Sequence, residues 1–176
     1  MIEVKNLVKK YGDHTAVDHL SFHVDKGQIY GFLGPNGAGK STTLNAIAGV
    51  WPIDSGKIYI GGDDVTKLSE HKRAKYLGRV FQDPMTGTAT TMSIEENMAI
   101  AARRGEKRGL SWGITHQERD TYREMLKALD LGLEDRLTSK VGLLSGGQRQ
   151  AITLLMASIK KPKLLLLDEH TAALDP

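Results

Sequence analysis

The spacing of hydrophobic and polar residues predicts strands and then a helix in the first part of the chain. Apolar and polar residues alternate from Leu20 to Asp25, a pattern typical of a strand with one buried face. A turn at Lys26-Gly27 is followed by the apolar run Ile29–Leu33, which predicts a second strand. A glycine-rich loop and a helix from about Gly39 to Gly49 come next. This order of strand, glycine-rich loop and helix is the opening unit of an α/β nucleotide-binding fold.

The segment that follows, as far as residue 81, predicts two more strands and one helix. Asp54-Ser55-Gly56 is a turn signal before a strand at Lys57–Ile60, and Gly61-Gly62 follows that strand. A helix around Ser69–Tyr76 leads to a short strand at Gly78–Phe81. Strands and helices therefore alternate, as in an α/β protein.

Residues from about 83 to 143 predict helices joined by polar links. Two helix starts carry capping boxes, one pairing Ser93 with Glu96 and the other Thr115 with Glu118. The run from Ser145 to Gln148 has the same spacing and predicts a helix to about residue 160, before a proline breaks the chain. We interpret about residues 84–150 as a helical subdomain inserted into one domain that spans residues 1–176.

An unbroken apolar run, Leu164–Leu167, precedes two acidic residues near the end of the chain. Such a run predicts a central parallel strand that is buried on both faces. The acidic pair, Asp168 and Glu169, would then lie where this strand ends. Alone, the pair is equally compatible with acids that terminate a strand at the surface.

Composition narrows the classes of protein. The chain has 176 residues, 40% of them hydrophobic and 26% charged, which is enough for one domain with a hydrophobic core. Cysteine is absent, so disulfides and thiolate metal sites are excluded. The N-terminus lacks the apolar core of a signal peptide, and no apolar run reaches the roughly 20 residues that span a bilayer. If the protein works at a membrane, another subunit must supply the membrane-spanning part.

The net charge of +3 is too small to indicate nucleic-acid binding, and we expect no nucleic-acid partner. A basic run contains Arg103, Arg104, Lys107 and Arg108. It fits a solvated loop better than a phosphate-binding patch.

Residues 34–41 fit the phosphate-binding pattern G-x-x-x-x-G-K-[ST]. Glycines let backbone N–H groups approach phosphate oxygens, and the following helix points its positive end at the same anion. Lys40 supplies a cation for the β- and γ-phosphates, and the Ser41 hydroxyl can ligate Mg²⁺. A plain glycine turn with a surface lysine fits less well, because a predicted strand precedes the loop and a helix follows it. The expected nucleotide-binding residues are Gly34, Pro35, Asn36, Gly37, Ala38, Gly39, Lys40, Ser41 and Thr42.

With this loop upstream, Leu164–Leu167 followed by two acids resembles a Walker B strand. Asp168 is then placed to hold Mg²⁺, usually through water. Glu169, one residue on, is placed to polarise the water that attacks the γ-phosphorus.

A second predicted anion site lies at Leu144-Ser145-Gly146-Gly147-Gln148. A serine hydroxyl, backbone N–H groups and a helix dipole face one way there. Two glycines in a first helical turn cost stability without a local gain, so a plain capped helix explains them poorly. One nucleotide does not need two such sites from one chain. The run matches the signature motif of ABC ATPases, which serves the ATP of a partner subunit through Ser145, Gly146, Gly147 and Gln148.

The chain thus resembles ABC transporter ATP-binding proteins over essentially its whole length. The resemblance implies an α/β fold: a P-loop NTPase core with a mainly parallel sheet, an N-terminal antiparallel β portion and the inserted helical subdomain. From about Thr43 onward the chain is similar to a bacterial uptake group of the tryptophan/tyrosine type. The first forty or so residues are more similar to exporter-linked ATPases.

The resemblance also implies roles for single residues. Tyr11 stacks on adenine with Val17 beside it, although an ordinary strand-end tyrosine is the alternative for Tyr11. Gln82 reaches toward Mg²⁺ and the attacking water and couples to the helical subdomain. Asp175 lies in a loop that crosses the dimer interface. The implied catalytic residues are Glu169, Gln82 and Lys40, and the implied metal-binding residues are Ser41, Gln82 and Asp168.

The resemblance implies a head-to-tail dimer that sandwiches two Mg-ATP molecules at the cytoplasmic face of the cell membrane. Partners would be ABC permease subunits in the membrane, a second ATP-binding subunit and a substrate-binding protein. The implied function is import of a small solute such as an amino acid. The alternatives are an exporter ATPase, a soluble ABC ATPase that acts on ribosomes or DNA, a non-enzymatic nucleotide-binding module, and a small P-loop kinase. The kinase would not need the signature motif.

The family's switch histidine lies beyond the region of Asp175, and His170 does not occupy its place. The other histidines all precede Asp168. We therefore expect a C-terminally truncated domain that lacks its closing strands, binds Mg-ATP through Lys40 and hydrolyses it slowly.

Overall fold

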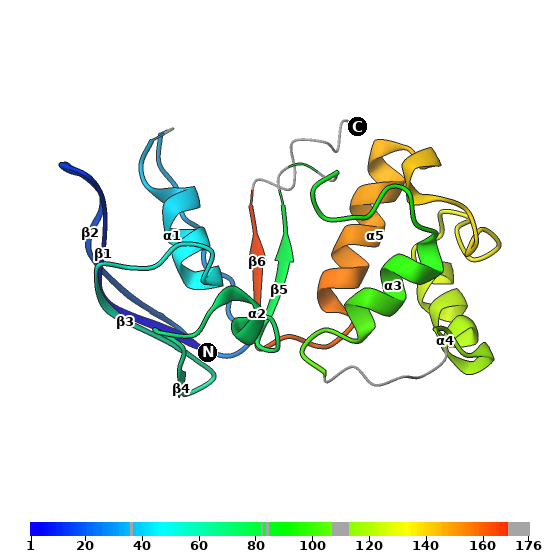
Figure 1. The fold of residues 1–176 in the computed structure, drawn as a ribbon, viewed down its shortest axis with the longest axis horizontal. Coiled ribbons are helices and arrows are strands. Elements are labelled where there is room, and N and C mark those ends of the chain that lie inside the picture. The colour runs from blue at the N-terminus through cyan, green and yellow to red at the C-terminus, as the bar shows by residue number, and fades with distance from the viewer. Residues whose placement is uncertain (36, 82, 84, 107–112, 169–176) are drawn as a thin grey trace. The chain divides into compact units, whose positions relative to one another are not determined.

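The computed structural model describes residues 1–35, 37–81, 83, 85–106 and 113–168 (Figure 1). The chain forms two compact units, Met1–Leu77 and Gly78–Pro176. Each unit has its own arrangement of strands and helices.

The first unit contains a four-stranded sheet in the order β2-β1-β3-β4. β1 (Ile2–Tyr11) lies between β2 (His14–Val24) and β3 (Ser55–Ile60), antiparallel to both, and β4 (Asp63–Asp64) pairs with β3. This confirms the predicted N-terminal antiparallel β portion.

A two-residue turn at Gly12-Asp13 joins β1 to β2, so that Tyr11 pairs with His14. Gly12 has a φ of 58°, a left-handed conformation that suits a tight hairpin turn. The apolar residues of β1 and β3 form the buried face of the sheet, with Leu7, Ile58 and Ile60 fully buried. Their alternation with polar residues is what selects strands here.

Two helices complete the first unit. α1 (Lys40–Ala48) lies within the predicted helix from about Gly39 to Gly49, and it buries Leu44, Ala46 and Ile47. α2 (Glu70–Arg73) is shorter than the predicted helix at residues 69–76, because residues 74–76 form a turn.

The apolar run Ile29–Leu33 forms no strand, contrary to the prediction. The side chains of Ile29 and Leu33 are almost fully exposed. A strand is stabilised by hydrogen bonds to a neighbouring strand, and within the described residues none pairs with this run. The prediction of a strand at Ile29–Leu33 is therefore wrong.

The second unit holds the two-stranded sheet of β5 (Leu77–Val80) and β6 (Leu164–Leu167). β6 has the predicted bounds, but its burial was predicted wrongly. Leu166 is buried, whereas Leu165 and Leu167 are each 37% exposed. The reason is that in the described part of the chain β6 pairs with β5 alone, so its other edge and much of its surface are uncovered.

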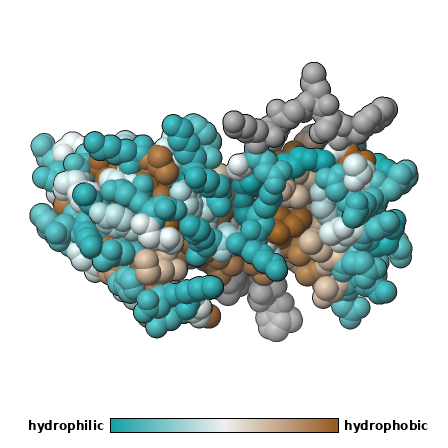
Figure 2. Space-filling view, turned by 90° about the horizontal axis from the view of Figure 1, so that it is seen from below, coloured by the Kyte–Doolittle hydropathy of each residue, from teal (hydrophilic) through white to brown (hydrophobic). Residues whose placement is uncertain are grey.

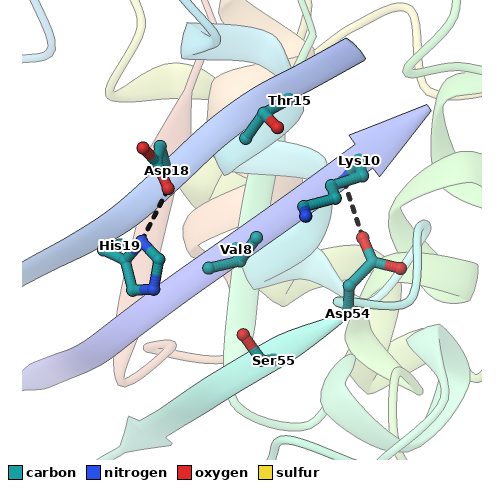
Figure 3. Close-up of a pocket in the computed structure, with 7 residues that line it drawn as sticks. All are labelled: Val8, Lys10, Thr15, Asp18, His19, Asp54 and Ser55. Carbon is teal, nitrogen blue, oxygen red and sulfur yellow. Dashed lines mark hydrogen bonds and ion pairs between the residues drawn. The ribbon is translucent and has the colours of Figure 1, made fainter. Parts of the chain in front are cut away.

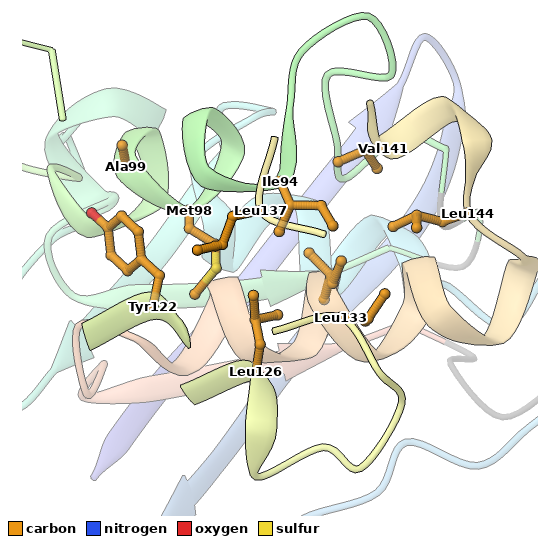
Figure 4. Packing of buried hydrophobic residues seen from close by; sticks show 10 residues of the cluster. Ile94, Met98, Ala99, Tyr122, Leu126, Leu133, Leu137, Val141 and Leu144 are labelled. Carbon is orange, nitrogen blue, oxygen red and sulfur yellow. The ribbon is translucent and has the colours of Figure 1, made fainter. Parts of the chain in front are cut away.

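Helices α3 (Ile94–Ala102), α4 (His116–Lys127) and α5 (Gly146–Ser158), with the short 3-10 helix η1 (Val141–Leu143), make up the rest of this unit. Figure 4 shows their apolar side chains pointing toward one another around a common core. The core contains Ile94, Met98, Ala99, Tyr122, Leu126, Leu133, Leu137, Val141, Leu144 and Ile152. The subdomain limits of about residues 84 and 150 stay a prediction.

All three expected capping boxes are present in this unit. Ser93 and Glu96 start α3, and Thr115 and Glu118 start α4, each through reciprocal side-chain to backbone hydrogen bonds. A third box starts α5.

Among the described residues no helix is long and apolar enough to cross a membrane, and hydrophilic residues predominate on the face shown in Figure 2.

Candidate functional site: a phosphate loop and a second exposed helix start

The phosphate loop leads directly into α1. Its glycines Gly37 and Gly39 have φ angles of 87° and 77°, in the left-handed region that favours glycine. A Cβ at Gly39 would lie 2.5 Å from the carbonyl oxygen of Ala16 in β2. Glycine is therefore required at position 39 both by the backbone conformation and by the close approach of β2.

The Lys40 side chain folds back over this loop. Its Nζ donates a hydrogen bond to the Gly34 carbonyl oxygen at 2.8 Å. Ser41 follows in the first turn of α1, where its side chain is exposed, and Thr42 is half-buried. An ammonium and a hydroxyl thus stand at the same helix start.

The start of α1 differs from the other long helix starts in having no side-chain cap. Gly39 is its N-cap residue, no side chain of the described residues accepts a hydrogen bond there, and the first turn holds no acidic residue. Each of α3, α4 and α5 begins instead with a capping box. Because the first N–H groups of a helix need acceptors from outside the helix, the uncapped start of α1 is suited to an anion.

Val17 and Tyr11 have different surroundings. Val17 is buried, and its Cγ2 lies 3.4 Å from the position that a Cβ of Gly39 would take. Tyr11 is 45% exposed and meets Trp51 edge-on, with ring centroids 5.7 Å apart. The structure therefore brings Val17 to the phosphate loop, and it gives Tyr11 a partner, Trp51, that the sequence did not reveal.

The second predicted anion site lies in the other unit. Ser145 Oγ accepts the Gln148 N–H at 3.2 Å, and Gln148 Oε1 accepts the Ser145 N–H at 3.2 Å. Gly146 and Gly147 form the first exposed residues of α5. A Cβ added at either glycine would meet no atom of the described residues within 4 Å, so among these residues nothing covers this helix start.

Asp168 follows β6, as predicted. Its N–H donates to the Val80 carbonyl oxygen at 3.2 Å, and its side chain is half-buried. Four other predicted site residues, Asn36, Gln82, Glu169 and Asp175, lie outside the described residues. Within the described ranges no three His, Asp or Glu side chains gather into a metal-binding group.

A polar hollow of about 580 Å³ lies on the sheet of the first unit, and Figure 3 shows the residues that line it. The Lys10 N–H donates to Asp54 Oδ2 at 2.6 Å, and this bond is the main cause of the lowered pKa of Asp54. His19 Nδ1 lies 2.6 Å from Asp18 Oδ1. None of the predicted site residues that the structure describes lines the hollow, so we do not assign the chemistry to it.

Sequence reasoning missed Ala16, Trp51 and Arg73. The first two make the contacts described above, and Arg73 is buried at the end of α2. Each acts through a residue distant in sequence, and no local pattern marks any of them.

Comparison with known proteins links both sites to one family. The model of the ABC transporter family matches residues 17–172. The tyrosine transport ATP-binding protein of Clostridioides difficile is 41% identical over all of this chain and 72% of its own length. The linearmycin resistance ATP-binding protein of Bacillus subtilis is 37% identical over all of this chain and 53% of its own length. The chain thus spans only about half the length of several curated relatives.

Solved structures agree. The ADP conformation of an ATP-binding cassette of an ABC transporter superposes with a TM-score of 0.81 and 30% identity, over 100% of this chain and 71% of that one. A dimeric bacterial ABC transporter cassette has the same TM-score and identity, over 99% of this chain and 76% of that one. The phosphate loop, the Ser145 helix start and Asp168 all lie within the matched residues. The chain belongs to the family of ABC transporter ATP-binding proteins.

Proposed function

We propose that this chain binds Mg-ATP and hydrolyses it as the nucleotide-binding part of an ABC transporter subunit. The observation that carries the proposal is the Lys40 ammonium, held 2.8 Å from the Gly34 carbonyl oxygen beside the uncapped start of α1. When ATP binds, Lys40 exchanges this carbonyl for oxygens of the β- and γ-phosphates. Backbone N–H groups of the loop and of the first helical turn hold the remaining oxygens.

The donor atoms present suit Mg²⁺. Ser41 offers an exposed hydroxyl and Asp168 a half-buried carboxylate, both of them the hard oxygen ligands that this ion prefers. With Gln82 they would hold the ion, which neutralises phosphate charge when bound. Glu169 would orient and polarise the attacking water.

We further propose that two copies assemble head to tail. The open start of α5 at Ser145–Gln148 would then complete the phosphate site of the partner copy, and Asp175 would lie at the interface. Within the part of the chain that the structure describes, no atom lies within 4 Å of a Cβ at Gly146 or Gly147, which leaves room for that approach. A related cassette in a post-hydrolysis state, bound to ADP and Pi, is dimeric at 29% identity, which supports this assembly.

The transport reaction proposed is import of a small solute such as an amino acid. Partner membrane subunits and a substrate-binding protein would act with the chain at the cytoplasmic face of the membrane. The tyrosine transport relative, at 41% identity over the whole chain, supports import. Export is the second candidate, because relatives at 37% identity are named for linearmycin resistance and Nod factor export.

The first test compares Mg-ATP affinity and ATP turnover in the full chain, in Lys40→Ala and in Lys127→Ala. Lys127 is an exposed lysine in the last turn of α4 and serves as the control. Loss of a charged hydrogen bond to phosphate is expected to weaken binding about 10- to 100-fold in Lys40→Ala. Equal affinities in the two variants would contradict the proposed phosphate site.

The direction of transport is tested in cells whose gene for this subunit carries the Lys40→Ala substitution. Import predicts reduced uptake of labelled tyrosine or a related amino acid relative to Lys127→Ala. Unchanged uptake together with slower efflux of a preloaded solute would favour export.

A further inference from the structure

Arg73 is a buried arginine that donates to backbone carbonyl oxygens. It ends α2 and is 2% exposed. Nε donates to the Leu68 carbonyl at 2.8 Å, and Nη2 donates to that of Thr66 at 2.9 Å. Nη1 donates to the carbonyls of Ala46 and Ile47 at 2.7 and 2.8 Å. One planar side chain therefore satisfies four acceptors of the first unit.

Two of these acceptors lie in the last turn of α1, where carbonyl groups need hydrogen-bond donors from outside the helix, and the Ala46 carbonyl also accepts the Gly49 N–H at 3.2 Å. Gly49 ends the helix with a φ of 82°. A Cβ at Gly49 would lie 2.9 Å from Arg73 Nε, so glycine leaves the space that the guanidinium fills. A cation at this end of a helix also interacts favourably with the helix dipole.

The other two acceptors lie in the segment that follows β4, which is tied to the sheet. The Ile58 N–H of β3 donates to Thr66 Oγ1 at 2.9 Å. The Val65 N–H donates to the Ile58 carbonyl at 2.9 Å. Arg73 therefore connects the end of α1 to the sheet through this segment.

From these contacts we infer that Arg73 is a positioning residue for the phosphate-binding helix. α1 has nine residues, too few for stability as an isolated helix in water, so tertiary contacts set its orientation. Arg73 holds its C-terminal end, and Lys40 stands at the other end. Because so short a helix moves as one body, displacement at the Arg73 end also moves the N–H groups that face the phosphates. This role rests on the proposed function, in which residues 34–41 bind the phosphates of ATP.

The test compares the wild-type chain, Lys40→Ala, Arg73→Met and Arg73→Lys. Arg123→Met, which removes an exposed arginine of α4, is the matched control. Affinities for Mg-ATP, Mg-ADP and adenosine are measured well below each melting temperature. We expect Arg73→Met to weaken both nucleotides about tenfold while leaving adenosine affinity unchanged. Arg73→Lys should lose less affinity, because it keeps the charge and loses the planar fork.

A merely structural arginine would lower the melting temperature without changing the affinity of the folded chain for any ligand. Equal ATP affinity in the wild type and Lys40→Ala would mean that the proposed function fails. If Lys40→Ala loses affinity but the folded Arg73 variants bind ATP like the wild type, the inference about Arg73 is overturned. Should Arg73→Met not fold, Arg73→Lys decides alone, since it must still weaken ATP more than adenosine.

Discussion

Replacing Gly147 by alanine should make the folded chain more stable and at the same time impair its ATP-dependent dimerisation. Gly147 is the second residue of α5, and among the described residues no atom lies within 4 Å of a Cβ placed there. Alanine is favoured over glycine in a helix by about 1 kcal/mol at interior positions. For the first turn we expect about 0.5–1 kcal/mol of stabilisation, because no steric cost opposes it.

For a chain of this size, that gain corresponds to a rise of about 1–4 °C in melting temperature. Differential scanning calorimetry without nucleotide measures it. Gly113→Ala is the control, because a Cβ at Gly113 also meets no described atom within 4 Å and Gly113 lies outside the described helices. The control reports the effect of alanine on the unfolded chain alone.

The functional effect of Gly147→Ala should have the opposite sign. A methyl group at this exposed helix start would keep the phosphates of the ATP that is bound to the partner copy away from the backbone N–H groups of α5. ATP-dependent dimerisation, followed by sedimentation velocity, should therefore be lost, while ATP affinity at the chain's own Lys40 loop persists. A lower melting temperature would refute the open geometry of α5, and wild-type dimerisation would refute the role of the glycine.

Two further predictions concern the helices of the second unit. Met98→Ala, at a fully buried core position of α3, should cost about 2–5 kcal/mol of unfolding free energy in urea. The control Ile100→Ala, at an exposed position of the same helix, should cost less than about 1 kcal/mol; similar losses in both would contradict the described core. Glu118 has a lowered pKa, chiefly because its carboxylate accepts the Thr115 backbone N–H. A carboxylate whose pKa is lower in the folded chain than in the unfolded chain stabilises the fold at pH values above its unfolded-state pKa. This stabilisation is lost as the pH falls through the folded-state pKa. Between pH 6 and pH 3 the melting temperature should therefore fall less in Glu118→Gln than in the exposed control Glu124→Gln. An equal fall in both variants would contradict the stabilising role of the Glu118 carboxylate.

The sequence alone located the features that depend on near neighbours. The capping boxes at Ser93, Thr115 and Ser145 were predicted and are present, because each is closed by hydrogen bonds within four residues. The bounds of α1 were predicted closely because the hydrogen bonds of a helix also join near neighbours, and the bounds of β6 coincide with those of its apolar run. The phosphate loop could be found because its chemistry requires particular residues at fixed spacing.

Only the tertiary structure decided what depends on distant partners. The apolar run Ile29–Leu33 is not a strand, and Leu165 of β6 is partly exposed, because strand pairing and burial require neighbours that a local pattern does not specify. The approach of Ala16 to Gly39 shows why glycine is needed there beyond its motif. Arg73 reads in the sequence as one more surface charge. Its buried guanidinium donates to carbonyl groups 26 and 27 residues away, which lie close to it only in the folded chain and are buried from water there.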